Sequence, residues 1–168
     1  MADALADRWR LSRFRRAPRA LAAHGQVGDA PVTVLKPQTY MNLSGLGLEP
    51  LLARPDLDPT HHLLVLVDDA ALPLGTFRLR ARGSSGGHHG LESVEQALGS
   101  RVYARLRIGI GPVPDDVVDL ADFVLAPFAP PEAATLRELV PQMGDAVECW
   151  VAEGIQRAMN RFNQKKLD

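Results

Sequence analysis

The fold class is decided by residues 62–69, which read His62-Leu-Leu-Val-Leu-Val67 followed by Asp68-Asp69. A nearly continuous apolar run of this length is typical of a strand buried on both faces. We expect a central strand with a pair of carboxylates at its C-terminal end. Ligands of open α/β sheets bind beyond such strand ends. Asp68 is therefore a candidate site residue that could orient a histidine, and capping of a turn is the alternative.

The segments on either side predict alternating helices and strands. Alternation and β-branched residues predict strands at 31–36, 77–82 and 103–111, and helical patterns occupy 2–9, 42–48, 91–98, 119–125 and the tail from 130. Asn42 or Ser44 is available to cap the second helix. We expect an α/β fold in a single domain over residues 1–168, because no linker or internal repeat divides the chain.

Composition fits one compact domain, and charge is concentrated at the two ends. The 168 residues are 46% apolar, and 19 Lys and Arg nearly balance 20 Asp and Glu. Both termini are nevertheless basic, and three basic residues recur every fourth position near the C-terminus: Arg157, Arg161 and Lys165. On a helix they share one face, which suits a polyanion such as RNA. The alternative is an ordinary solvated helix face.

The glycine-rich loop over residues 83–90 leads into a predicted helix. It lacks the Lys-Ser/Thr pair of a phosphate loop and the G-x-G-x-x-G pattern, which argues against a mononucleotide site. A helix N-terminus favours an anion such as an RNA phosphate, and Gly86 and Gly87 would let backbone approach a ligand closely. The alternative is a mobile turn.

Neither metal nor cofactor is expected. The histidines at 61, 62, 88 and 89 and the two aspartates lack the spacing of a metal site, and Cys149 is the only cysteine. The sequence contains no apolar run of membrane-spanning length and no signal-peptide pattern, so we expect a soluble, cytoplasmic protein.

Five ordered motifs resemble the bacterial-type peptidyl-tRNA hydrolases. Residues 36–45 are similar to K-P-x-T-F/Y-M-N-x-S-G, and residues 68–75 to D-D/E-x-D/E-L-P-x-G. Residues 86–91 resemble G-G-H-N-G-L, and residues 105–111 match R-L/F-R-I/V-G-I/V-G. The ending from Trp150 to Asn163 resembles the family's C-terminal helix. The resemblance covers essentially the whole chain.

The resemblance implies a mixed, mostly parallel sheet flanked by helices, and hydrolysis of the ester that joins a peptide to the 3′ ribose of tRNA. It implies that Asn42 holds substrate or the attacking water and that Asp68 orients the catalytic histidine. Tyr40 would line the groove for the terminal nucleotide, with Gly87 and His89 on the substrate side. A labile ester needs one general base and a few fixed donors, without metal or cofactor. The implied partner is peptidyl-tRNA, and we expect a monomer.

The chain departs from the family pattern in three places. The family's opening strand and its T-R-H-N segment, which carries the catalytic histidine, are not found in this sequence, and no histidine present has that context. His89 stands where the family has Asn, and Ala71 replaces an acidic residue.

Three functions remain open from the sequence: a peptidyl-tRNA hydrolase, a catalytically silent tRNA-binding relative, and a non-RNA carboxylic-ester hydrolase. The replacement by His89 favours the silent relative, whereas the basic ends argue against the third. Without the family histidine, we expect tRNA binding with cleavage slowed by about 10²–10⁴.

Overall fold

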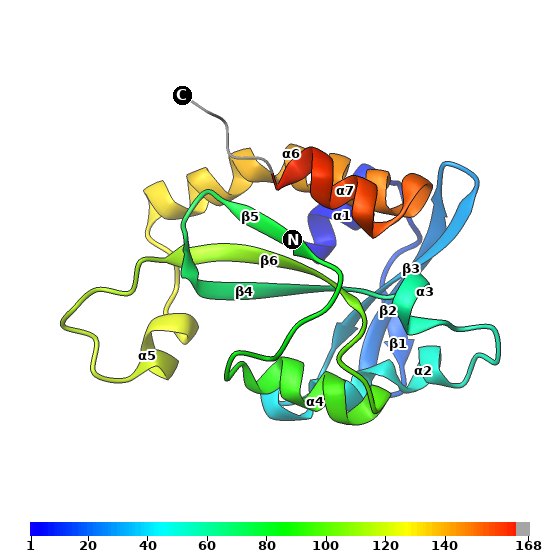
Figure 1. Ribbon diagram of the computed structural model, residues 1–168, viewed down its shortest axis with the longest axis horizontal. Coiled ribbons are helices and arrows are strands. Elements are labelled where there is room, and N and C mark those ends of the chain that lie inside the picture. The colour runs from blue at the N-terminus through cyan, green and yellow to red at the C-terminus, as the bar shows by residue number, and fades with distance from the viewer. Residues whose placement is uncertain (164–168) are drawn as a thin grey trace. The chain divides into compact units, whose positions relative to one another are not determined.

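The computed structural model describes residues 1–163 as alternating helices and strands (Figure 1). The chain divides into two compact units, the first made of residues 1–63 and 81–104 and the second of residues 64–80 and 105 onward. Helices accompany a three-stranded sheet in each unit. The predicted α/β class is confirmed, whereas a single domain over residues 1–168 stays a prediction.

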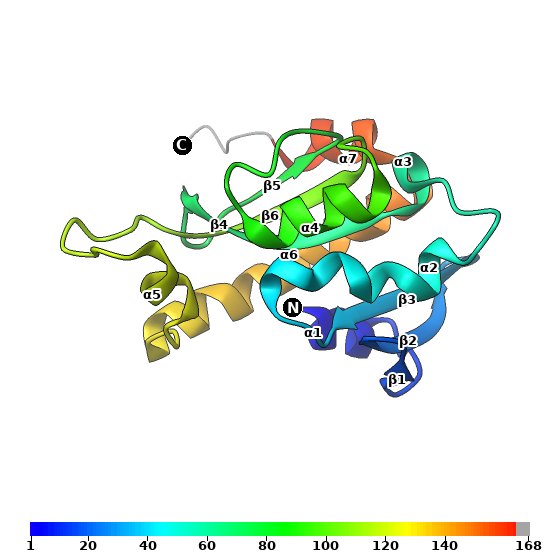
Figure 2. The same cartoon turned by 90° about the horizontal axis from the view of Figure 1, so that it is seen from below.

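The first unit contains an antiparallel sheet in the order β1-β2-β3 (Figure 2). The strands are β1 (Arg15–Ala17), β2 (Ala20–Val27) and β3 (Ala30–Pro37), and α1 (Ala2–Arg8) packs against β3. Val27 pairs with Ala30 across a two-residue turn that begins at Gly28, whose φ of +59° is favourable only for glycine. Because two-residue turns join antiparallel strands, this part of the sheet contributes no parallel pair.

The remaining elements of the first unit are helical. A 3₁₀-helix, η1 (Met41–Leu48), is followed by α2 (Glu49–Leu52), α3 (Pro59–His62) and α4 (His89–Leu98). The predicted cap by Asn42 or Ser44 is wrong, because the residue that precedes η1 is Tyr40 and no side chain caps this end. Ser44 Oγ instead donates to the Met41 carbonyl at 2.8 Å, inside the first turn.

The second unit contains a sheet in the order β4-β6-β5, formed by β4 (Leu64–Pro73), β5 (Phe77–Arg80) and β6 (Ala104–Gly111). The pair β5–β6 is antiparallel. Two predictions about residues 62–69 are corrected here: β4 is an outer strand of this sheet, and it continues to Pro73. Asp68 and Asp69 therefore lie within the strand and not at its end, because residues 70–73 continue the pairing.

The C-terminal helices also belong to the second unit. They are α5 (Leu120–Leu125), α6 (Pro130–Glu153) and α7 (Ile155–Phe162), and α7 packs against α6 and β5. Gly154, at φ +84°, separates α6 from α7, so the predicted helical tail is two helices. After α7, Asn163 donates to the Leu79 carbonyl and accepts from the Leu79 N–H, both at 2.8 Å. The side-chain amide thus satisfies both backbone groups of a fully buried residue.

Candidate functional site

Two of the motifs are packed together in the first unit, because η1 lies against α4. The Gly45 N–H donates to Ser93 Oγ at 2.9 Å. A Cβ placed on Gly90 would lie 2.6 Å from Met41 Sδ. Since Met41 and Gly90 are near the starts of their helices and Gly45 and Ser93 are one turn further along both, the two helices run in the same direction. The M-N-x-S-G and G-G-H-x-G segments therefore meet at one end.

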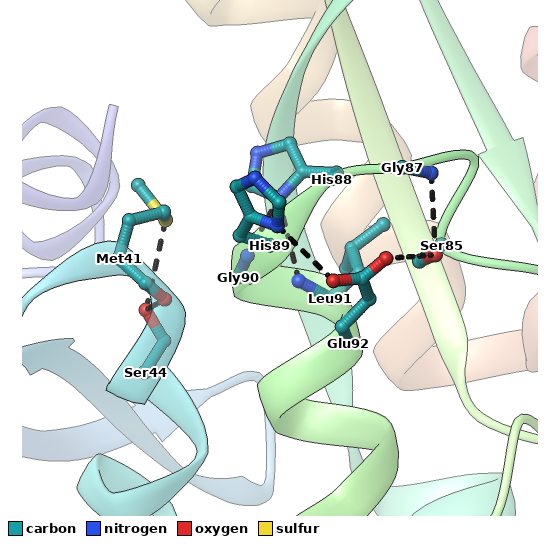
Figure 3. A network of polar contacts seen from close by, with 9 residues as sticks. All are labelled: Met41, Ser44, Ser85, Gly87, His88, His89, Gly90, Leu91 and Glu92. Carbon is teal, nitrogen blue, oxygen red and sulfur yellow. Dashed lines mark hydrogen bonds and ion pairs between the residues drawn. The ribbon is translucent and has the colours of Figure 1, made fainter. Parts of the chain in front are cut away.

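The start of α4 is organised by two adjacent histidines (Figure 3). His88 caps the helix, and its Nδ1 accepts from the N–H groups of Gly90 at 3.1 Å and Leu91 at 3.3 Å. Nδ1 of His89 lies 3.1 Å from Glu92 Oε2. The helix begins two residues earlier than predicted, since the His88 side chain satisfies donors that would otherwise be orphaned.

The glycine-rich loop turns through left-handed backbone just before this helix. Gly86 has φ +62° and Gly87 has φ +83°, so both positions require glycine for conformational reasons. The Gly87 N–H donates to Ser85 Oγ at 3.3 Å, and that hydroxyl lies 3.4 Å from Glu92 Oε1. The loop is thereby linked to α4. Contact between Gly87 and a substrate stays a prediction.

Asn42 and Tyr40 are both exposed at the start of η1. Within residues 1–163, the side chain of Asn42 makes no hydrogen bond to another residue. Tyr40 is 83% exposed and lines an open cavity of about 510 Å³. The other residues that line it are Arg19, Gln38, Thr39, Leu43 and Leu46. Both predicted residues are thus accessible to a ligand.

Asp68 and Asp69 belong to the second unit. Asp69 is buried, its Oδ2 lies 3.0 Å from Arg107 Nε on β6, and its Oδ1 accepts from the Ala71 N–H. Arg107 Nε makes no hydrogen bond, so the contact is an ion pair without hydrogen-bond alignment. Asp68 is half-buried. Its predicted role toward a histidine stays a prediction.

The predicted basic face is described in part. Arg157 and Arg161 lie on α7 four positions apart, and Lys165 lies outside the described residues. Arg161 pairs with Glu153 at 3.1 Å. Arg157 is exposed and, in the part of the chain that the structure describes, makes no hydrogen bond or ion pair. Arg157 is consequently the better placed of the two to bind a phosphate.

Other chemistries find little support in the described part of the chain. Burial raises the pKa of the Cys149 thiol, which disfavours the reactive thiolate. Residues 1–163 contain no group of three or more His, Cys, Asp or Glu side chains placed to hold a metal ion. No helix described there is long and apolar enough to cross a membrane.

Two polar residues of this site were missed from the sequence. Glu92 holds His89, and Ser93 holds η1 against α4. Their spacing from His89, three and four positions along a helix, was a usable signal, because such residues share a helix face. It was overlooked because the helix was predicted to begin only at residue 91.

Comparisons with known proteins agree with this geometry. A family model described as peptidyl-tRNA hydrolase matches residues 1–168. A peptidyl-tRNA hydrolase of Gemmatimonas aurantiaca is 46% identical over 164 residues, which cover 96% of this chain and 86% of the relative. Another, of Chloroflexus aggregans, is 44% identical over 161 residues, covering 96% and 85%.

Solved structures of peptidyl-tRNA hydrolases are also similar. The enzyme from Acinetobacter baumannii, determined at 1.00 Å, matches with a TM-score of 0.87 and 27% identity, covering 98% of this chain and 83% of that one. A complex of a peptidyl-tRNA hydrolase with N-propanol matches with a TM-score of 0.88 and 27% identity, covering 99% and 84%. The class that fold and site define is an α/β ester hydrolase. Within that class, the chain belongs to the peptidyl-tRNA hydrolase family.

Proposed function

We propose that this chain hydrolyses the ester between a peptide and the 3′ ribose of tRNA. The observation that carries the proposal is the alignment of η1 and α4, which gathers Asn42, His88 and His89 at the shared end of two helices. An amide and two imidazoles there can bind a carbonyl oxygen, a hydroxyl or water. The reaction requires little more, because an ester needs one base and a few fixed donors.

The other predicted residues complete the proposal. Tyr40 offers an exposed ring for a terminal base, and Asp68 would orient an imidazole. Arg157 and Arg161 would bind phosphates of the tRNA. We further propose that the protein acts in the cytoplasm as a monomer and without a cofactor, recycling tRNA during translation.

The direct test of this function compares esters with and without tRNA. The purified chain should cleave an N-acetylated aminoacyl-tRNA and leave a simple ester of the same N-acetylated amino acid almost intact, because phosphate contacts supply binding energy only to the former. Release of the labelled amino acid measures both reactions. Equal cleavage of the two substrates would favour a general esterase. Binding of tRNA without cleavage would favour the silent relative, which the His89 replacement supports.

Salt dependence tests the basic face of α7. Arg157→Gln should reduce the slope of log affinity for tRNA against log salt by about 0.7–0.9, the value for one phosphate contact. Arg161→Gln should reduce it less, because Arg161 is already paired with Glu153 at 3.1 Å. Filter binding between about 50 and 200 mM salt measures the slope. A slope left unchanged by Arg157→Gln would remove α7 from the tRNA-binding surface.

A further inference from the structure

The pair His89–Glu92 fixes which nitrogen of one imidazole carries a proton. Nδ1 of His89 lies 3.1 Å from Glu92 Oε2. An ionised carboxylate only accepts hydrogen bonds, so Nδ1 must be the donor. In the neutral ring the lone pair is then on Nε2. The ring is 74% exposed, so it is accessible to water.

The neighbouring His88 is fixed in the opposite way. Its Nδ1 accepts from two backbone N–H groups, those of Gly90 and Leu91, so the proton of a neutral ring must be on Nε2. His88 therefore presents a donor and caps the helix, whereas His89 presents an acceptor. Two adjacent imidazoles thus offer complementary hydrogen-bonding groups at one helix end.

The other three histidines do not combine these features. His24 Nδ1 contacts the Thr33 hydroxyl at 2.9 Å, and His62 Nδ1 accepts from the Asp58 N–H. His61 does pair with a carboxylate, that of Asp58 at 2.7 Å, but it stands on α3, where no motif residue lies. Only His89 joins a carboxylate partner to a position inside a motif.

The surroundings of His89 contain few charges. Figure 3 shows both rings at the start of α4, with Met41 of η1 to one side and Glu92 to the other. The titratable groups that the described contacts bring to the ring are Glu92 on its own helix and His88 just before it. Helix η1 carries no ionisable side chain. Glu92 is further held by Ser85, whose hydroxyl donates to Oε1 at 3.4 Å.

We propose that His89 is the general base of the hydrolysis and that Glu92 is its positioning residue; this rests on the proposed function. His89 Nε2 removes a proton from water as the water oxygen bonds to the ester carbon and the carbonyl electron pair moves to oxygen. Collapse of this intermediate breaks the bond to the ribose 3′ oxygen, which receives the proton from the imidazolium. Glu92 stays ionised and stabilises the imidazolium. The products are the peptide acid and tRNA with a free 3′ hydroxyl.

The test follows single-turnover cleavage of N-acetylated aminoacyl-tRNA from about pH 5 to 9, the range over which imidazole titrates. The unsubstituted chain should lose rate as the pH falls, because protonated Nε2 cannot accept a proton. His89→Asn, which restores the family residue, should lower the rate constant by about 10²–10⁴ and abolish that acid limb. Glu92→Gln should cause a smaller loss and shift the limb to lower pH, because the imidazolium loses its counter-charge.

His61→Asn is the matched control, since it removes another carboxylate-paired histidine on α3; both its rate and its acid limb should match those of the unsubstituted chain. Unchanged rate and acid limb in His89→Asn would overturn the inference while leaving the proposed function in place. No cleavage by the unsubstituted chain would overturn the proposed function and this inference with it.

Discussion

Replacing Asn42 with alanine should slow ester hydrolysis about 10²–10³-fold, the usual cost of removing one fixed donor from a reacting oxygen. The free energy of unfolding should barely change. The side chain is exposed and makes no hydrogen bond within residues 1–163, so the fold does not depend on it. An amide with no structural partner, at the meeting point of two motifs, is available to hold water or the ester oxygen.

Two further variants separate these roles for Asn42. Asn42→Asp keeps the size and the acceptor but removes the N–H donor, so it should be as slow as Asn42→Ala. Ser44→Ala, one residue apart in the same turn, removes a hydrogen bond to Met41 and should cost about 1 kcal/mol of stability with little loss of rate. Single-turnover cleavage and thermal unfolding measure the two effects. A stable Asn42→Ala variant with full activity would remove Asn42 from the mechanism.

The elements that the sequence predicted well are those with a strong local signal. The apolar run after His62 and the alternation at 77–82 both became strands. Strand β2 was missed because Ala20–Val27 is rich in alanine and glycine, which have low strand propensity. That strand forms because it pairs with β3 along its full length, a contact between segments that local propensity does not encode.

The candidate site shows the same division. The motifs identified Asn42, Tyr40 and His89, and the structure adds which contacts hold them. The placement of Asp68 was wrong, because an apolar run reveals where a strand becomes polar but not where its pairing ends. Likewise, the tautomers of His88 and His89 follow from hydrogen-bond partners that only the folded chain brings together.

The alignment of η1 with α4 is itself testable at Gly45, where an added methyl group has no room. A Cβ there would overlap the Ser93 carbonyl oxygen and would lie 2.7 Å from the Ser93 carbonyl carbon and 3.0 Å from Ala97 Cβ. A backbone carbonyl in a helix cannot rotate away as a side chain can, so the two helices must separate. Gly45→Ala should therefore lower the free energy of unfolding by about 3 kcal/mol, the upper range for overpacking.

Gly99→Ala is the control that isolates sterics from backbone strain. Gly99 ends α4 at φ +63° with nothing within 4 Å of an added Cβ, so its replacement should cost about 1 kcal/mol through conformation alone. Because Gly45 has no such φ, the excess loss in Gly45→Ala measures the closeness of the two helices. Separation should also slow cleavage, since Asn42 and His89 start different helices and their spacing depends on this contact. Urea unfolding and the cleavage assay measure both effects, and a Gly45→Ala variant no less stable than Gly99→Ala would contradict the close packing on which the site depends.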